Sequence, residues 1–84
     1  MTEKFEKAIE LVKKLKQVND EDKLILYSYY KQANLGDINI EKPSILNRVE
    51  MEKWKGWNNV KGMSKEDAMK NYVKKVKELL KNSL

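Results

Sequence analysis

The spacing of the apolar residues constrains this chain more than any other feature. After Ser64, apolar side chains return every three or four positions over about three turns, which places them on one face of an α-helix. A second stripe of the same spacing runs from about Glu3 to Lys16. No alternating strand pattern competes, so we expect an all-α fold whose helices bury these stripes on one another. The stripe after Ser64 comprises Met69, Tyr72, Val73, Val76, Leu79 and Leu80, and the earlier one comprises Phe5, Ala8, Ile9, Val12 and Leu15.

Two further helices are predicted between these stripes. One spans about Glu21–Leu35, because Asn19 or Asp20 can cap its start and Gly36 can end it. The other spans about Glu50–Lys61. No repeat and no low-complexity linker divides the chain, so we expect one domain over residues 1–84.

The lengths of the connections suggest how these helices run. The links near residues 17–20 and 62–64 are short and suit antiparallel neighbours, and Ser64–Asp67 resembles a capping box. The connection Gly36–Val49 is longer, and its roughly 14 residues reach up to ~46 Å when extended. A 15-residue helix is only ~22 Å long, so this connection can carry the chain back along the bundle. We therefore expect the second and third helices to run parallel, joined by a long crossover in a four-helix bundle.

Composition excludes several classes of site. The 84 residues contain no Cys and no His, which removes thiolate zinc sites, thiol nucleophiles and the commonest general base at neutral pH. We expect a binding protein without a metal or cofactor rather than an enzyme. The 18 Lys+Arg against 13 Asp+Glu give a net charge of +5, which suggests an anionic partner. No targeting or membrane-spanning segment is visible, so we expect a cytoplasmic protein.

The second predicted helix carries the most informative candidate residues. At 100° per residue, Leu24, Tyr27 and Lys31 share one face, and Tyr30 flanks it. An anion over Lys31 could also receive the Tyr27 hydroxyl, and a flat ring could lie on Tyr30. The alternative from these residues alone is that both tyrosines are half-buried core aromatics and that Lys31 is a solvated charge.

Other helices offer further candidates at the edges of their stripes. Lys53 stands beside Trp54, and Lys13 borders the first stripe. Tyr72 lies on the apolar face of the last helix, from which its hydroxyl could point into a cleft. Each has a structural alternative, because edge lysines extend along apolar surface and helical tyrosines pack. Trp54 and Trp57 are expected to be core residues.

Several motifs, in order along nearly the whole chain, resemble the acyl-CoA-binding protein family. Their combination is highly specific, although each motif alone is weak. The likeness also includes Phe5 and Lys13 near the start. The motifs are Tyr27–Ala33, Gly36–Asn39, Glu41–Pro43, Lys53-Trp54-x-x-Trp57-Asn58 and Lys61–Tyr72.

The resemblance implies a four-helix bundle in up-down-down-up order and a non-catalytic protein that binds long-chain acyl-CoA esters one to one. Carried over to this chain, it implies that Tyr27, Lys31 and Lys53 hold the 3′-phosphate of the CoA ribose. Lys13 would help to neutralise the phosphates. Such a protein would act as a carrier and buffer of acyl-CoA, with transient contact to membranes or lipid enzymes, and a monomer is the simplest state.

The remaining implied contacts concern the adenine and the acyl chain. Tyr30 and Tyr72 would contact the adenine and its surroundings, and Leu24 would wall an acyl groove between helices two and three. This chain departs from the family at Ile9, where a small Ala is usual, and at Glu52, which replaces a small residue before Lys53. The stretch from Arg48 to Met51 also matches poorly.

Two other functions are compatible with the composition. The net positive charge permits a small basic module that binds nucleic acid, but the basic residues are spread over all helices and mixed with acids. An amphipathic first or last helix could instead bind a peptide or a membrane surface, although the bundle core explains both stripes better. We therefore expect no nucleic-acid partner.

Overall fold

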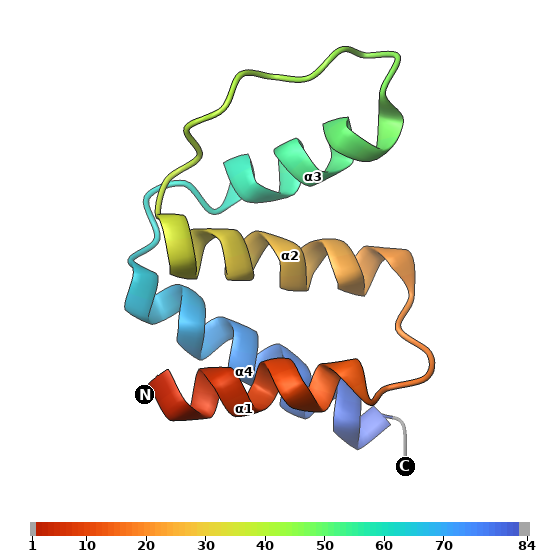
Figure 1. The fold of residues 1–84 in the computed structure, drawn as a ribbon, viewed down its shortest axis with the longest axis vertical. Coiled ribbons are helices and arrows are strands. Elements are labelled where there is room, and N and C mark those ends of the chain that lie inside the picture. The colour runs from red at the N-terminus through yellow and green to blue at the C-terminus, as the bar shows by residue number, and fades with distance from the viewer. Residues whose placement is uncertain (1, 83–84) are drawn as a thin grey trace.

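The computed structural model describes residues 2–82, and Met1, Ser83 and Leu84 of the expected domain lie outside the described part. The described residues form four helices and no strand: α1 (Thr2–Lys13), α2 (Asp20–Leu35), α3 (Arg48–Asn59) and α4 (Lys65–Asn82) (Figure 1). The predicted all-α class is confirmed. No helix in residues 2–82 is long and apolar enough to span a membrane.

Helix ends follow local capping chemistry. The Asn19 side chain accepts the Asp22 N–H at 2.8 Å, and the Ser64 hydroxyl accepts the Asp67 N–H at 3.0 Å, as the sequence predicts. Gly36 ends α2 with a φ of 82°, a conformation that favours glycine, and donates its N–H to the Gln32 carbonyl.

Three expected boundaries are wrong by two or three residues. α1 ends at Lys13 rather than Lys16, because the N–H groups of Lys14 and Leu15 bond to carbonyls only three residues back. α3 begins at Arg48 rather than Glu50, because Asn47 caps it. α3 ends at Asn59 rather than Lys61, because the N–H groups of Val60 and Lys61 bond to carbonyls three residues back. All three differences arise from individual hydrogen bonds, which apolar periodicity does not report.

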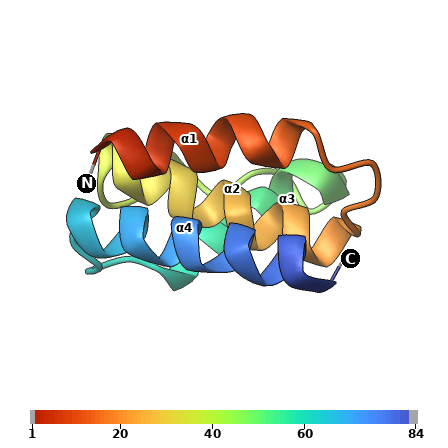
Figure 2. The same ribbon diagram turned by 90° about the horizontal axis from the view of Figure 1, so that it is seen from below.

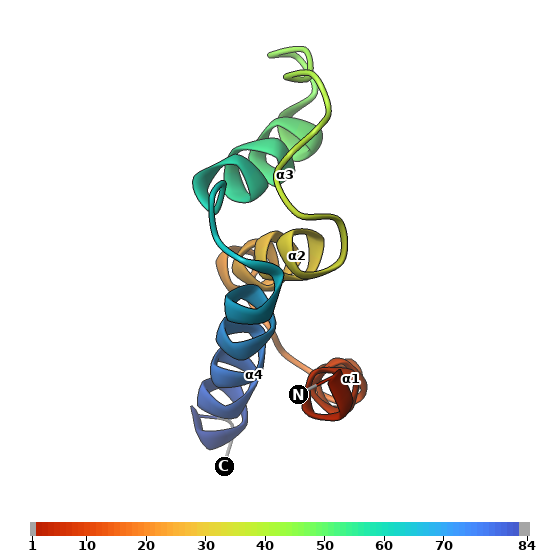
Figure 3. The ribbon, with the colours of Figure 1, turned by 90° about the vertical axis from the view of Figure 1, so that its left-hand side faces the viewer.

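α2 is the central helix of the bundle. It packs against α3 on one side and α4 on the other, and α1 packs against α4 (Figures 1 and 3). Figure 2 shows α1 and α4 side by side on the face opposite α3. α2 and α3 run in the same direction, and residues 36–47 carry the chain back between them (Figure 1). The up-down-down-up order with a long crossover is therefore confirmed.

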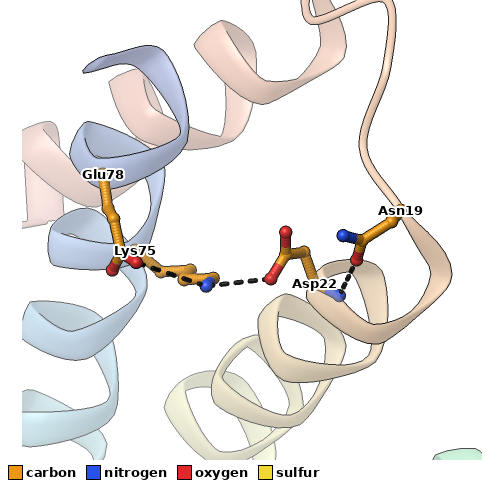
Figure 4. Close-up of polar contacts among 4 residues, drawn as sticks. All are labelled: Asn19, Asp22, Lys75 and Glu78. Carbon is orange, nitrogen blue, oxygen red and sulfur yellow. Dashed lines mark hydrogen bonds and ion pairs between the residues drawn. The ribbon is translucent and has the colours of Figure 1, made fainter. Parts of the chain in front are cut away.

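The core lies where α1, α2 and α4 meet. A separate contact joins α3 to α2, where a Cβ added to Gly56 would collide with the Ser28 hydroxyl, so the two helices approach closely. The half-buried Lys75–Asp22 ion pair, 2.9 Å between Nζ and Oδ1, joins α4 to α2 (Figure 4). The core cluster comprises Phe5, Ala8, Leu26, Ala33, Ala68, Tyr72 and Val76.

The two tryptophans of α3 hold the long connection in place. Trp57 is 2% exposed and donates its indole N–H to the Gly36 carbonyl at 2.9 Å. Trp54 is only half-buried and donates to the Ile40 carbonyl at 3.1 Å. The expectation that both are core residues is therefore right for Trp57 and wrong for Trp54, whose indole must stay near the surface to reach the connection.

A group of hydrogen bonds around Gln32, here called the polar node, fixes the C-terminal end of α2. The buried Gln32 amide donates to the Met63 carbonyl at 2.7 Å and to Asp37 at 2.8 Å, and Asp37 also accepts the Gly62 N–H at 2.7 Å. These bonds hold the pKa of Asp37 below its ordinary value, with the Gly62 bond contributing most. The node joins the end of α2, the start of the long connection and the link between α3 and α4.

Candidate ligand-binding site

Lysines from two helices lie near the Tyr27 ring. Nζ of Lys31, one turn further along α2, is 5.7 Å from the centre of the Tyr27 ring. Nζ of Lys53, on α3, is 5.6 Å from the same ring. The parallel course of α2 and α3 brings Lys53 to this face. The structure therefore places together the three residues for which the resemblance implies one phosphate.

The Lys31 ammonium lies on aromatic surface. It is 5.6 Å from the centre of the Trp57 ring as well as near Tyr27, so two rings hold its position. Among residues 2–82, Lys31 forms no ion pair with a carboxylate. Its charge is thus positioned and uncompensated, which suits the binding of an external anion.

The electrostatics of Tyr27 and Lys53 include one carboxylate. Nζ of Lys53 lies 3.8 Å from Oε1 of Glu50, one turn earlier in α3. Burial, and secondarily the negative charge of Glu50, raise the pKa of the Tyr27 hydroxyl above its ordinary value of 10.0. The phenol therefore stays protonated at neutral pH and can donate a hydrogen bond, as both ammonium groups can.

A hollow of about 860 Å³ opens beside Tyr27. It lies between the end of α1, the link to α2, and one side of α2, with α4 contributing Tyr72. Most of its lining is apolar or aromatic side chains with polar groups among them, the usual character of a ligand pocket. The lining residues are Val12, Leu15, Lys16, Gln17, Val18, Asn19, Asp22, Lys23, Leu26, Tyr27, Tyr30 and Tyr72.

Tyr30 and Tyr72 form an aromatic wall of this hollow. Their ring centres are 6.4 Å apart, and the Phe5 ring meets Tyr72 edge-on at 5.1 Å. Tyr72 is 4% exposed and Tyr30 is 41% exposed, so one ring is fixed in the core while the other presents its surface to solvent. Burial, and to a smaller extent Tyr30, raise the pKa of the Tyr72 hydroxyl.

Leu24 lies at a second, smaller hollow. This one has a volume of about 350 Å³ and lies between α2 and α3. Its apolar lining includes Ile25, Tyr29 and Val60, and Gly56 lines it on the α3 side. Tyr27 does not line it, so α2 separates two hollows with different linings. A hollow that Leu24 lines therefore lies between helices two and three, where the resemblance implies an acyl groove.

Lys13 lies at the exposed end of α1. It ends α1 with an exposed side chain, and its Nζ is 3.4 Å from Oε1 of Glu10. It is not one of the described residues that line the larger hollow, whereas Lys16 and Lys23 are. Neither lysine was a candidate from the sequence. Lys16 was missed because it was expected in the first helix rather than in the link.

The positions that depart from the family also have defined surroundings. Ile9 is half-buried and packs against the core cluster. Glu52 is exposed, lines the smaller hollow, and lies 3.8 Å from the Lys55 ammonium. The contacts of Lys31 and Lys53 with the Tyr27 ring involve neither Ile9 nor Glu52.

Comparisons with known proteins agree with this architecture. The family model described as acyl CoA binding protein matches residues 2–76. A protein from a Hypsibius species that carries the name of an acyl-CoA-binding protein is 51% identical over 84 residues, covering 98% of this chain and 94% of that protein. Acyl-CoA-binding domain-containing protein 3 of Oryza sativa subsp. japonica is 48% identical over 80 residues. The match covers 94% of this chain and 52% of that protein, so this chain spans about half of its length.

Solved structures give the same result. The crystal structure of Oryza sativa acyl-CoA-binding protein 2 superposes with a TM-score of 0.92 at 43% identity, covering 98% of this chain and 92% of that one. The crystal structure of ACBP from Moniliophthora perniciosa gives a TM-score of 0.91 at 38% identity, covering 98% of this chain and 82% of that one. These relatives are named for acyl-CoA and not for nucleic acid. The chain therefore belongs to the acyl-CoA-binding protein family.

Proposed function

We propose that this protein binds long-chain acyl-CoA esters and acts as their intracellular carrier and buffer, through a single domain over residues 1–84. The observation that carries the proposal is the position of the Lys31 and Lys53 ammonium groups, 5.7 and 5.6 Å from the centre of the Tyr27 ring, which itself lines the larger hollow. Two ammonium groups and one protonated phenol are therefore available as donors around this ring.

The 3′-phosphate of CoA suits this set of donors. A phosphomonoester carries about −1.5 to −2 charges near neutral pH and has three strong acceptor oxygens. Lys31 and Lys53 supply positive charge, and the Tyr27 hydroxyl supplies a third donor. Lys13 would help to neutralise the other phosphates, from its exposed position at the end of α1.

The aromatic wall suits the adenine. Tyr30 presents an exposed ring, and Tyr72 is fixed behind it by Phe5, so a flat base can lie against a surface that is already ordered. The base would then occupy the larger hollow next to the phosphate. Because these rings are held by packing, little side-chain entropy is lost when the ligand binds.

The acyl chain would use the groove between α2 and α3, walled by Leu24. Each buried CH₂ contributes roughly 0.8 kcal/mol, so about ten of them contribute ~8 kcal/mol before the cost of ordering the chain. The head group would therefore set the orientation of the ligand, and the tail would supply most of the affinity. Free CoA should bind far more weakly than its long-chain ester.

A carrier of this kind needs no catalytic group. It would act in the cytoplasm as a monomer, shield a detergent-like thioester from water, and release it during transient contact with membranes or lipid enzymes. Nucleic-acid binding is not proposed, because the basic residues are spread over all helices and mixed with acids rather than gathered on one recognition helix.

Isothermal titration calorimetry tests this function. Palmitoyl-CoA should bind with a stoichiometry of one, and free CoA should bind at least about a hundredfold more weakly, since ~3 kcal/mol corresponds to the burial of only four CH₂ groups. Equal affinities for the two ligands would show that no acyl groove operates. The absence of heat with palmitoyl-CoA, confirmed by a second binding method, would overturn the proposed function itself.

A further inference from the structure

A carboxylate lies within the group of cations proposed to hold the phosphate. Glu50 is in the first turn of α3, where its N–H bonds to Asn47 at 3.4 Å. Its Oε1 is 3.8 Å from Nζ of Lys53, which in turn faces the Tyr27 ring. Its negative charge also reaches the Tyr27 hydroxyl, whose pKa it helps to raise. A negative group is unexpected where an anion is to bind.

The two lysines therefore differ in the ligand-free protein. Lys53 is paired with Glu50, whereas Lys31, among the residues that the structure describes, pairs with no carboxylate and rests on two rings. The carboxylate that lines the larger hollow, Asp22, is held by Lys75 at 2.9 Å. Glu50 is thus the acid whose charge acts directly on the phosphate donors.

Both side chains of the Lys53–Glu50 pair are accessible to solvent. The Lys53 side chain is 38% exposed and that of Glu50 is 53% exposed. When a phosphate binds Lys53, the Glu50 carboxylate must either stay close to the new negative charge or turn into solvent and lose its ion pair. Both alternatives oppose binding, and both act on a phosphate dianion more strongly than on an uncharged group.

We infer that Glu50 determines the affinity and specificity of the site. Its carboxylate pairs with Lys53 in the ligand-free protein and thereby weakens the selectivity of the protein for ligands that carry the 3′-phosphate. This inference rests on the proposed function. Removing the Glu50 charge should tighten the binding of such ligands about two- to fivefold, the range expected for partly exposed charges. Ligands that lack this phosphate should be little affected.

The test compares two ligands across matched variants. Dissociation constants for palmitoyl-CoA and for 3′-dephospho-palmitoyl-CoA are measured at one ionic strength with the wild type, Glu50→Gln, Glu50→Ala and Glu66→Gln. Glu66 is the control, because it is an exposed acid on α4 that lies 3.9 Å from Lys70 and lines neither hollow. Its substitution changes the net charge by the same amount. Circular dichroism melts verify that each variant is folded.

Both Glu50 variants should bind palmitoyl-CoA about two- to fivefold more tightly, and the dephospho ester with unchanged affinity, while Glu66→Gln changes neither. The inference is overturned if the Glu50 variants tighten both esters alike, if they match Glu66→Gln, or if they weaken palmitoyl-CoA. In each of these cases the wild type still binds palmitoyl-CoA, so the proposed function stands. A wild type that binds neither ester overturns both.

Discussion

Replacing Lys31 by Ala is the most informative single perturbation of the proposed site. The substitution removes an ammonium that two aromatic rings hold at 5.7 and 5.6 Å. A hydrogen bond to a charged group contributes about 1.5–3 kcal/mol, so palmitoyl-CoA should bind about 10- to 150-fold more weakly. Tyr27→Phe removes one neutral donor and leaves both lysines, and should cost about 0.5–1.5 kcal/mol, or about two- to thirteenfold. The loss should be larger for Lys31 because a charge disappears with the donor.

The folded state should tolerate the Lys31 change. Cation–π contacts at exposed sites contribute about 0.5–1 kcal/mol each, so losing both should lower the free energy of unfolding by about 1–2 kcal/mol, a fraction of the stability of a small domain. Calorimetry with palmitoyl-CoA therefore measures the site, provided that a thermal melt shows the variant to be folded. Lys74→Ala is the matched control, because Lys74 is an exposed lysine of α4 that lines neither hollow.

The ionic strength of the assay provides a second check on the same variants. Added salt should reduce the difference in palmitoyl-CoA affinity between the wild type and Lys31→Ala, because salt screens the interaction of a partly exposed charge with the phosphate. A dissociation constant for Lys31→Ala within twofold of the wild type would refute the reasoning, as would an equal loss in Lys74→Ala.

Three further predictions concern the fold that positions the site. Val76→Ala removes two methyl groups from a core position that is 1% exposed. It should lower the free energy of unfolding, measured by urea titration, by about 2–3 kcal/mol. A loss below about 0.5 kcal/mol would contradict the placement of Val76 in the core. Because the folded pKa of Asp37 is lowered, its contribution to stability is present above its ordinary value of 3.8 and is lost as pH falls towards the folded pKa. Denaturation at several pH values should show Asp37→Asn to have a flatter acid limb than the wild type, and parallel limbs would count against the role of Asp37. Asp22→Asn breaks the ion pair to Lys75 and should cost about 0.5–1 kcal/mol; a more stable variant would indicate that the cost of partly burying the pair exceeds its attraction.

Much of the fold could be predicted because its determinants are local. The caps at Asn19, Gly36 and Ser64 each depend on residues within one turn, and the structure contains all three. The long crossover could be predicted from the length of the connection between the second and third helices. The end of α1 and the start of α3 were misplaced, since apolar spacing continues past Lys13 although the backbone hydrogen bonds change there.

The site was less predictable, because its residues come from several helices. Tyr27 and Lys31 are one turn apart, so their shared face followed from helical geometry. The convergence of Lys53 on them came only from the resemblance, because it depends on how α3 lies against α2. Glu50 was overlooked as a member of the site, although an acid one turn before Lys53 was a readable signal. Lys16 was missed because its position depends on where α1 ends.

Phosphorus NMR of palmitoyl-CoA bound to the wild-type protein tests the central claim most directly. A phosphomonoester loses its second proton with a pKa of about 6, and two nearby ammonium groups favour the dianion. The account predicts that the 3′-phosphate resonance shifts on binding and that its pKa in the complex lies below that of the free ester. A 3′-phosphate that titrates in the complex as it does in free palmitoyl-CoA would contradict the placement of that group between Lys31 and Lys53.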